Sequence, residues 1–134
     1  MDRKIKIEVN GKTWHANIVN NSSGDGLINL LKRGALKVKM KDYGNFEKVG
    51  DLPENLPTND VDYTTKPGDL ILYLGKHIVI YYDKNSWEFT KLGEIENTTQ
   101  AELKQVLGKG NCEVTFSLWI WYLKNIIFGI IYLY

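Results

Sequence analysis

The sequence predicts a mainly β protein, a closed or nearly closed barrel with two short helices over its ends. Apolar and polar residues alternate with a period of two along several segments, which is typical of half-buried strands. Two further segments, 70–74 and 78–82, are apolar at nearly every position and predict strands that are covered on both faces. Short strands combined with two short helical segments favour a barrel, and closure also removes exposed sheet edges.

The N-terminal region predicts a β-hairpin followed by a helix. Apolar and polar residues alternate on both sides of Asn10-Gly11, a pair that favours a type I′ turn because both positions take a positive φ. The hairpin is therefore expected over residues 4–19. Apolar residues at helical spacing predict a helix over about 24–33. Candidate N-cap residues precede this segment, and Gly34 follows it as a helix stop.

The middle of the chain predicts one strand and then a long loop. Leu36, Val38 and Met40 alternate with lysines, which predicts a strand whose outer face carries those lysines. Residues 42–68 contain all three prolines of the chain, so we expect an ordered surface loop with short extended pieces. A loop of this length inside a compact domain is often functional.

The C-terminal half predicts a helix between strands. The apolar runs are followed by turn residues and by a strand over 87–92. Thr99 and Glu102 have capping-box spacing, so the threonine side chain should accept from the Glu102 amide while the glutamate reaches back to the Thr99 amide. Residues 112–118 alternate again and predict the last strand.

Composition excludes several classes of function. A chain of 134 residues is expected to form one main domain, and a net charge of +1 gives no footprint for nucleic acid. The single cysteine, Cys112, cannot form an internal disulfide, and the first residues show no signal-peptide core, so we expect a cytoplasmic protein. His15 and His77 lack ligand spacing, so no metal or cofactor is expected.

A set of short motifs, taken in order, resembles the small bacterial cyclophilin-like domains. The resemblance covers residues 4–118 and is strongest over 43–118. It rests on Asp42-Tyr43-Gly44, Phe46-Glu47-Lys48-Val49-Gly50, Leu56-Pro57-Thr58, Pro67-Gly68-Asp69, Asn85-Ser86-Trp87 and Val114-Thr115-Phe116-Ser117-Leu118. It implies an eight-stranded antiparallel barrel with a helix at each end.

The resemblance also implies a candidate site. Prolyl isomerases of the wider cyclophilin family carry a Phe-His-Arg motif, and Phe46-Glu47-Lys48 stands about where that motif is expected. Lys48 is therefore the candidate catalytic residue, although a lysine lacks the planar hydrogen-bonding fork of an arginine. Tyr43, Phe46, Lys48 and Trp87 are the candidate ligand-binding residues.

These observations leave three functions open. The first is a non-catalytic binding module for an extended peptide, such as a proline-containing one, or for a small ligand. The second is a weak peptidyl-prolyl isomerase that uses Lys48. The third is an interaction protein that assembles through its hydrophobic C-terminal segment, with no particular oligomeric state indicated.

That C-terminal segment, 119–134, lies beyond the resemblance and is treated apart from the domain over 1–118. It carries one charged residue, Lys124, and is rich in aromatic and β-branched residues. It is interpreted as an accidental extension, as an element packed on the barrel or on a second copy, or as a membrane-surface contact with Trp119, Trp121 and Tyr122 at the headgroups. Left exposed, such a segment promotes aggregation.

Overall fold

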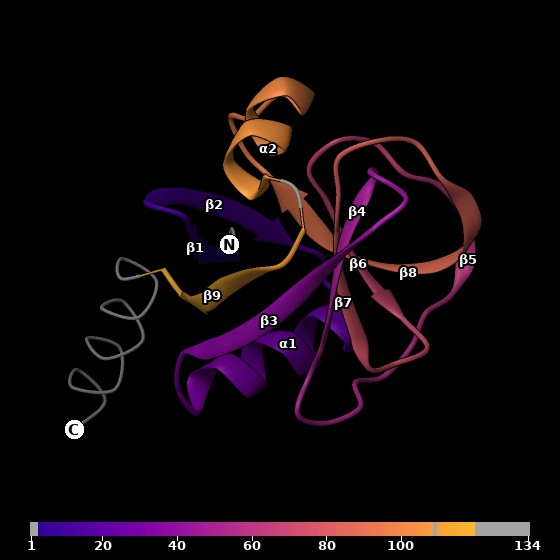
Figure 1. Cartoon of the computed structure of the whole chain (residues 1–134). Coiled ribbons are helices and arrows are strands. Elements are labelled where there is room, and N and C mark those ends of the chain that lie inside the picture. The colour runs from indigo at the N-terminus through magenta and orange to yellow at the C-terminus, as the bar shows by residue number, and fades with distance from the viewer. Residues whose placement is uncertain (1–2, 109, 120–134) are drawn as a thin grey trace.

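The computed structural model describes residues 3–108 and 110–119 (Figure 1). Within them the chain forms nine strands and two helices. In chain order these are β1 (Lys4–Val9), β2 (Lys12–Ile18), α1 (Ser22–Lys32), β3 (Leu36–Tyr43), β4 (Glu47–Asp51), β5 (Val61–Thr64), β6 (Asp69–Tyr73), β7 (His77–Tyr81), β8 (Ser86–Ile95), α2 (Gln100–Leu107) and β9 (Cys112–Leu118).

Eight of the strands close into an antiparallel barrel. Their order around the barrel is β2-β1-β9-β3-β4-β7-β6-β8, and β8 pairs back onto β2 to complete the ring. At this seam Ile18 lies opposite Gly93. The remaining strand, β5, pairs with the outer part of β8 and has no second neighbour among the described strands. The prediction of a closed antiparallel barrel is confirmed.

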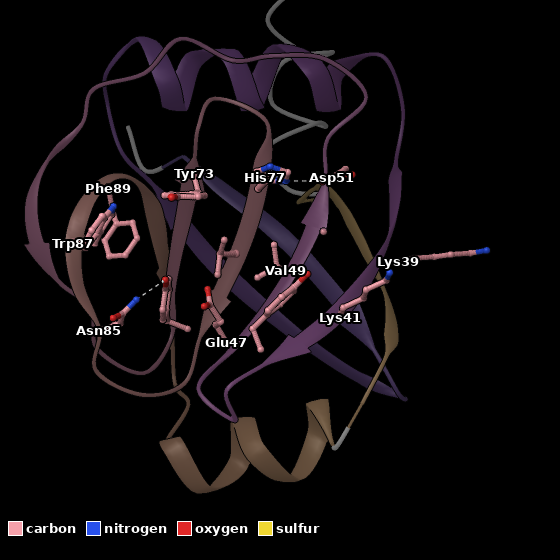
Figure 2. Close-up of a pocket in the computed structure, with 14 residues that line it drawn as sticks. Lys39, Lys41, Glu47, Val49, Asp51, Tyr73, His77, Asn85, Trp87 and Phe89 are labelled. Atoms are coloured by element: carbon pink, nitrogen blue, oxygen red, sulfur yellow. Dashed lines mark hydrogen bonds and ion pairs between the residues drawn. The ribbon is translucent and has the colours of Figure 1, made fainter.

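The main hydrophobic core fills the barrel and continues beneath both helices, which lie at opposite ends of the barrel (Figures 1 and 2). Inward positions of the alternating strands supply most of it, as the period of two requires. Trp14 is 2% exposed, and its indole Nε1–H donates to the Glu102 carboxylate over 2.7 Å, which ties β2 to α2. The two capping helices are therefore attached through the same core that the strands enclose.

The helix ends show what their sequences specify. α1 begins at Ser22, two residues before the expected start, because Asn21 is the N-cap and its side chain accepts from the amides of Ser23 and Gly24. Thr99 caps α2 and accepts from the Glu102 amide over 3.1 Å. The second hydrogen bond of a capping box, from the Thr99 amide to the Glu102 carboxylate, is replaced, because that carboxylate accepts from the Trp14 indole instead.

In the region expected to be a long loop with short extended pieces, the extended pieces are two paired strands, β4 and β5. The sequence obscures β4 because one of its inward positions is held by Lys48, so the apolar alternation that marks a strand is missing there. The remaining stretch, 52–60, is ordered as expected. Leu52 and Leu56 are buried, and the amides of both donate to carbonyl oxygens of the β6–β7 turn over 2.8 Å.

The C-terminal segment lies mostly outside the described residues, and so do the roles predicted for it. Trp119 is described and is half-buried, with its ring 5.4 Å from the His15 ring and 5.8 Å from the Lys4 ammonium. Trp121 and Tyr122 fall in the part that is not described. Within residues 3–108 and 110–119, no helix is long and apolar enough to cross a bilayer.

Candidate functional site

A cavity of about 560 Å³ opens on the outer face of the barrel, over strands β3, β4, β7, β6 and β8 (Figure 2). Except for Gly50, its walls come from residues that face away from the barrel core. They are Lys39, Lys41, Tyr43, Glu47, Val49, Gly50, Asp51, Tyr73, His77, Val79, Tyr81, Asn85, Trp87 and Phe89.

This cavity exists because the central strands are apolar on both faces. Their inward residues join the main core, while their outward residues form a second buried cluster of Ile71, Val79, Tyr81 and Phe89. The outer part of β8 leaves the ring and pairs with β5, with Trp87 opposite Tyr63. The aromatic side chains of this part of β8 form one wall of the cavity, and the buried apolar cluster forms its floor.

The aromatic wall has a buried part and an exposed part. The Phe89 ring is 3% exposed and lies 5.5 Å from the Tyr81 ring and 6.3 Å from the Tyr73 ring. Trp87 is 64% exposed although it belongs to the same wall, and Tyr43 at another part of the cavity is 54% exposed. Aromatic side chains left open around a concave surface are characteristic of binding sites.

A short polar network crosses the cavity floor. The Asn85 side-chain amide donates to the Tyr81 hydroxyl over 3.2 Å, and Tyr81 in turn hydrogen-bonds to the half-buried Glu47 carboxylate. Burial raises the pKa of Glu47, the hydrogen bond from Tyr81 offsets part of that rise, and the nearby Asp42 charge adds to it. Burial also raises the pKa of the Tyr81 hydroxyl. Glu47 is thus a carboxyl group that holds its proton more tightly than an exposed glutamate.

Charged residues occupy the other sides of the cavity. Lys39 and Lys41 project from β3 on the side opposite the Trp87 and Phe89 wall (Figure 2). At the upper edge in that view the His77 Nδ1 lies 2.6 Å from the Asp51 carboxylate. A ligand would therefore meet apolar rings on one side and charged groups on the others.

Lys48 lies on the inner side of β4 and has no exposed surface. Its ammonium donates to the Asp42 carboxylate over 3.1 Å and to the carbonyl oxygens of Gly108 and Gly110 over 3.0 and 2.5 Å. Successive side chains of a strand point to opposite faces, so Lys48 points into the barrel where its neighbours Glu47 and Val49 point into the cavity. The structure gives Lys48 a role in holding α2, and its catalytic role stays a prediction.

The Asp42 carboxylate completes this inner ion pair. The Tyr82 hydroxyl donates a hydrogen bond to the same oxygen that accepts from Lys48. Burial raises the pKa of Asp42, but the hydrogen bonds from Tyr82 and Lys48 outweigh it and lower the pKa below its usual range. The Asp42 carboxylate therefore stays charged at neutral pH.

The four expected ligand-binding residues are only partly brought together. Tyr43 and Trp87 line the cavity, whereas Phe46 packs beside it, with its ring stacked 6.2 Å from Tyr81. Tyr81 and Phe89 also line the cavity, although they are not among the four residues expected from the sequence. Tyr81 lies two positions after Val79 on β7, so the two side chains lie on the same face of the strand. This spacing of two residues was the sequence signal for an outward-facing aromatic ring.

Comparison with known proteins gives one family and one shared fold. A solved structure that is similar is the solution structure of a hypothetical protein from Archaeoglobus fulgidus, with a TM-score of 0.60 and 14% sequence identity over 88% of this chain and 95% of that chain. Identity that low shows the fold alone. No curated protein matches the chain. The sequence model of the cyclophilin-like family matches residues 7–117, and the chain therefore belongs to the cyclophilin-like family.

Proposed function

We propose that this protein is a binding module that takes an extended peptide or a small ligand into the outer-face cavity. The proposal rests on the observation that Trp87 and Tyr43 line this cavity and are 64% and 54% exposed. A ligand that covers these rings removes apolar surface from water, which contributes on the order of 25 cal/mol per Å² before the costs of association.

The placement of the polar groups supports binding without turnover. Lys48 faces the barrel interior and is already hydrogen-bonded to three oxygen atoms, so a ligand in the cavity does not touch its ammonium. The polar groups that a ligand can reach include Glu47, Asn85, Lys39 and Lys41. These can accept or donate hydrogen bonds and so fix the orientation of a bound molecule.

The test is a binding screen by ¹⁵N NMR with short peptides, some containing proline and some not, together with small aromatic compounds. Binding in the cavity should shift the amide signals of Val49, Val79 and Phe89. Val49→Arg places a long side chain in the cavity and should abolish those shifts. Thr115→Arg is the matched control, because Thr115 is also half-buried and outward-facing but lies on β9, outside the cavity.

The same peptides also test whether the protein catalyses prolyl isomerisation. Cis–trans exchange of the proline-containing peptides is measured with the unmodified protein and with Lys48→Met. Binding without faster exchange supports the module proposed here. Exchange that is accelerated and then lost in a Lys48→Met protein that is still folded supports the isomerase, and the absence of any shift in the cavity overturns the proposal.

A further inference from the structure

The outermost strand, β5, offers a second surface that is separate from the cavity. It pairs with β8 along one side, and Thr65, directly after it, donates its amide to the Asn85 carbonyl oxygen over 2.9 Å. In an antiparallel pair, backbone groups of alternate residues point toward the partner strand and away from it. The amides and carbonyls of Asp62 and Thr64 therefore point away from β8, and no other strand among the described residues pairs with them.

The side chains of this edge are sorted by face. Val61 and Tyr63 lie opposite Phe89 and Trp87 and share the apolar face that borders the cavity. Asp62 lies directly opposite Glu88 on the other face. Like charges in directly opposed cross-strand positions repel each other, and within the described residues neither carboxylate has a cationic partner.

This arrangement selects the partner. A second copy of β5 would bring a further Asp62 carboxylate to the edge and increase the repulsion. A strand that carries a basic residue opposite Asp62 would instead neutralise it. The neighbouring residues of such a strand would point toward the apolar face, because side chains alternate. Val61, which is 58% exposed, is then covered by an apolar side chain.

We propose that β5 is a docking edge for an extended peptide in which basic and apolar residues alternate, the peptide adding as a further strand through the free backbone groups of Asp62 and Thr64. Strand addition of this kind draws affinity from main-chain hydrogen bonds and specificity from the alternate side chains. The surface is distinct from the proposed cavity function and does not depend on it.

The probe is the peptide acetyl-Ile-Lys-Ile-Lys-Ile-amide carrying a fluorescent label, with binding followed by anisotropy. Its matched control has glutamate in place of both lysines and the same apolar residues. We expect the lysine peptide to bind at least tenfold more tightly than the glutamate peptide. Asp62→Lys should reverse that preference, since it changes the sign of the charge at the edge. Equal binding of both peptides, or no binding of either, overturns the proposal.

Two substitutions separate strand addition from simple charge attraction. Thr64→Pro removes an amide that points away from β8, so the β5–β8 pairing should persist while peptide binding falls at least tenfold. Thr64→Ala is its control, because both variants lose the hydrogen bond to the Ser86 hydroxyl and only the proline loses the amide. Unchanged binding to Thr64→Pro overturns strand addition.

The peptide itself supplies the same test if Thr64→Pro fails to fold. A peptide that is N-methylated on the amides that would face β5 should lose its binding to the unmodified protein, and retained binding contradicts the proposal. Val49→Arg, which fills the cavity, should leave binding of the lysine peptide unchanged. A loss of binding in Val49→Arg would place the peptide in the cavity and overturn the edge site.

Discussion

The Lys48 ammonium donates a hydrogen bond of 3.0 Å to the carbonyl oxygen of Gly108, the residue that ends α2. A side chain from β4 thereby holds the end of a helix that is distant in the sequence. Carbonyl oxygens at a helix C-terminus lack intrahelical donors and carry partial negative charge, so a cation there is stabilising. The barrel and its capping helix are joined by this contact as well as by their shared core.

Lys48→Met should destabilise the protein strongly. It removes the buried cation and leaves the Asp42 carboxylate and the two carbonyl oxygens without that donor, and breaking one side of a buried pair typically costs about 3–5 kcal/mol. Urea unfolding measures the change. The double variant Lys48→Met, Asp42→Asn should recover part of the loss, and a cost below about 1 kcal/mol would show that the contact is not structural.

Glu47 should titrate above its usual pKa of 4.5 in the folded protein, because burial disfavours its charged form. A raised pKa means that the group contributes stability below pH 4.5 and that this contribution is lost as the pH rises through the folded value. Carboxyl ¹³C NMR follows the titration directly. Tyr81→Phe should raise the pKa further, since the hydrogen bond from Tyr81 lowers it, whereas a fall would contradict this assignment.

Gly93→Ala should weaken the barrel at its seam. A Cβ at this position would lie 2.2 Å from the Asn17 carbonyl oxygen on β2, which belongs to the backbone and cannot rotate away. We expect a loss of about 1–3 kcal/mol by thermal unfolding. Gly26→Ala is the comparison, because the nearest atom there is a Pro57 side-chain carbon at 3.1 Å and alanine favours the helix. Equal effects of the two changes would contradict the steric argument.

Trp87→Ala and Phe89→Ala should separate binding from stability. Phe89 is 3% exposed, so its truncation should cost about 3–5 kcal/mol, whereas the largely exposed Trp87 should change the free energy of unfolding by less than about 0.5 kcal/mol. Affinity for ligands found in the NMR screen should fall in Trp87→Ala at unchanged fold. Retained affinity would remove Trp87 from the site.

The strands and helices were largely predictable because their signals are local. Alternation around Asn10-Gly11 predicts the first hairpin, and the structure pairs β1 with β2 there. Thr99 was identified as a cap from its spacing to Glu102 and is one. In both cases residues close in sequence specify the conformation of their own backbone.

The inner and outer faces of β4 were not predictable. A lysine on a strand is read as a solvent-facing residue, because burying a charge costs free energy unless it is paired. The partners of Lys48 come from β3 and from the segment after α2, and only the closed barrel brings them together. Of the expected site residues, Tyr43 and Trp87 line the cavity, and Lys48 lies outside it.

The sequence by itself determined the fold class, most of the strands, both helices and the family, since these follow from periodicity, turn residues and short motifs along the chain. The tertiary structure decided which face of each strand joins the core and which lines the cavity. It also decided which charged side chains are buried and which are exposed. Those outcomes depend on which strands become neighbours when β8 pairs with β2, and long-range pairing of that kind leaves no local mark at Lys48, Glu47 or Asp62.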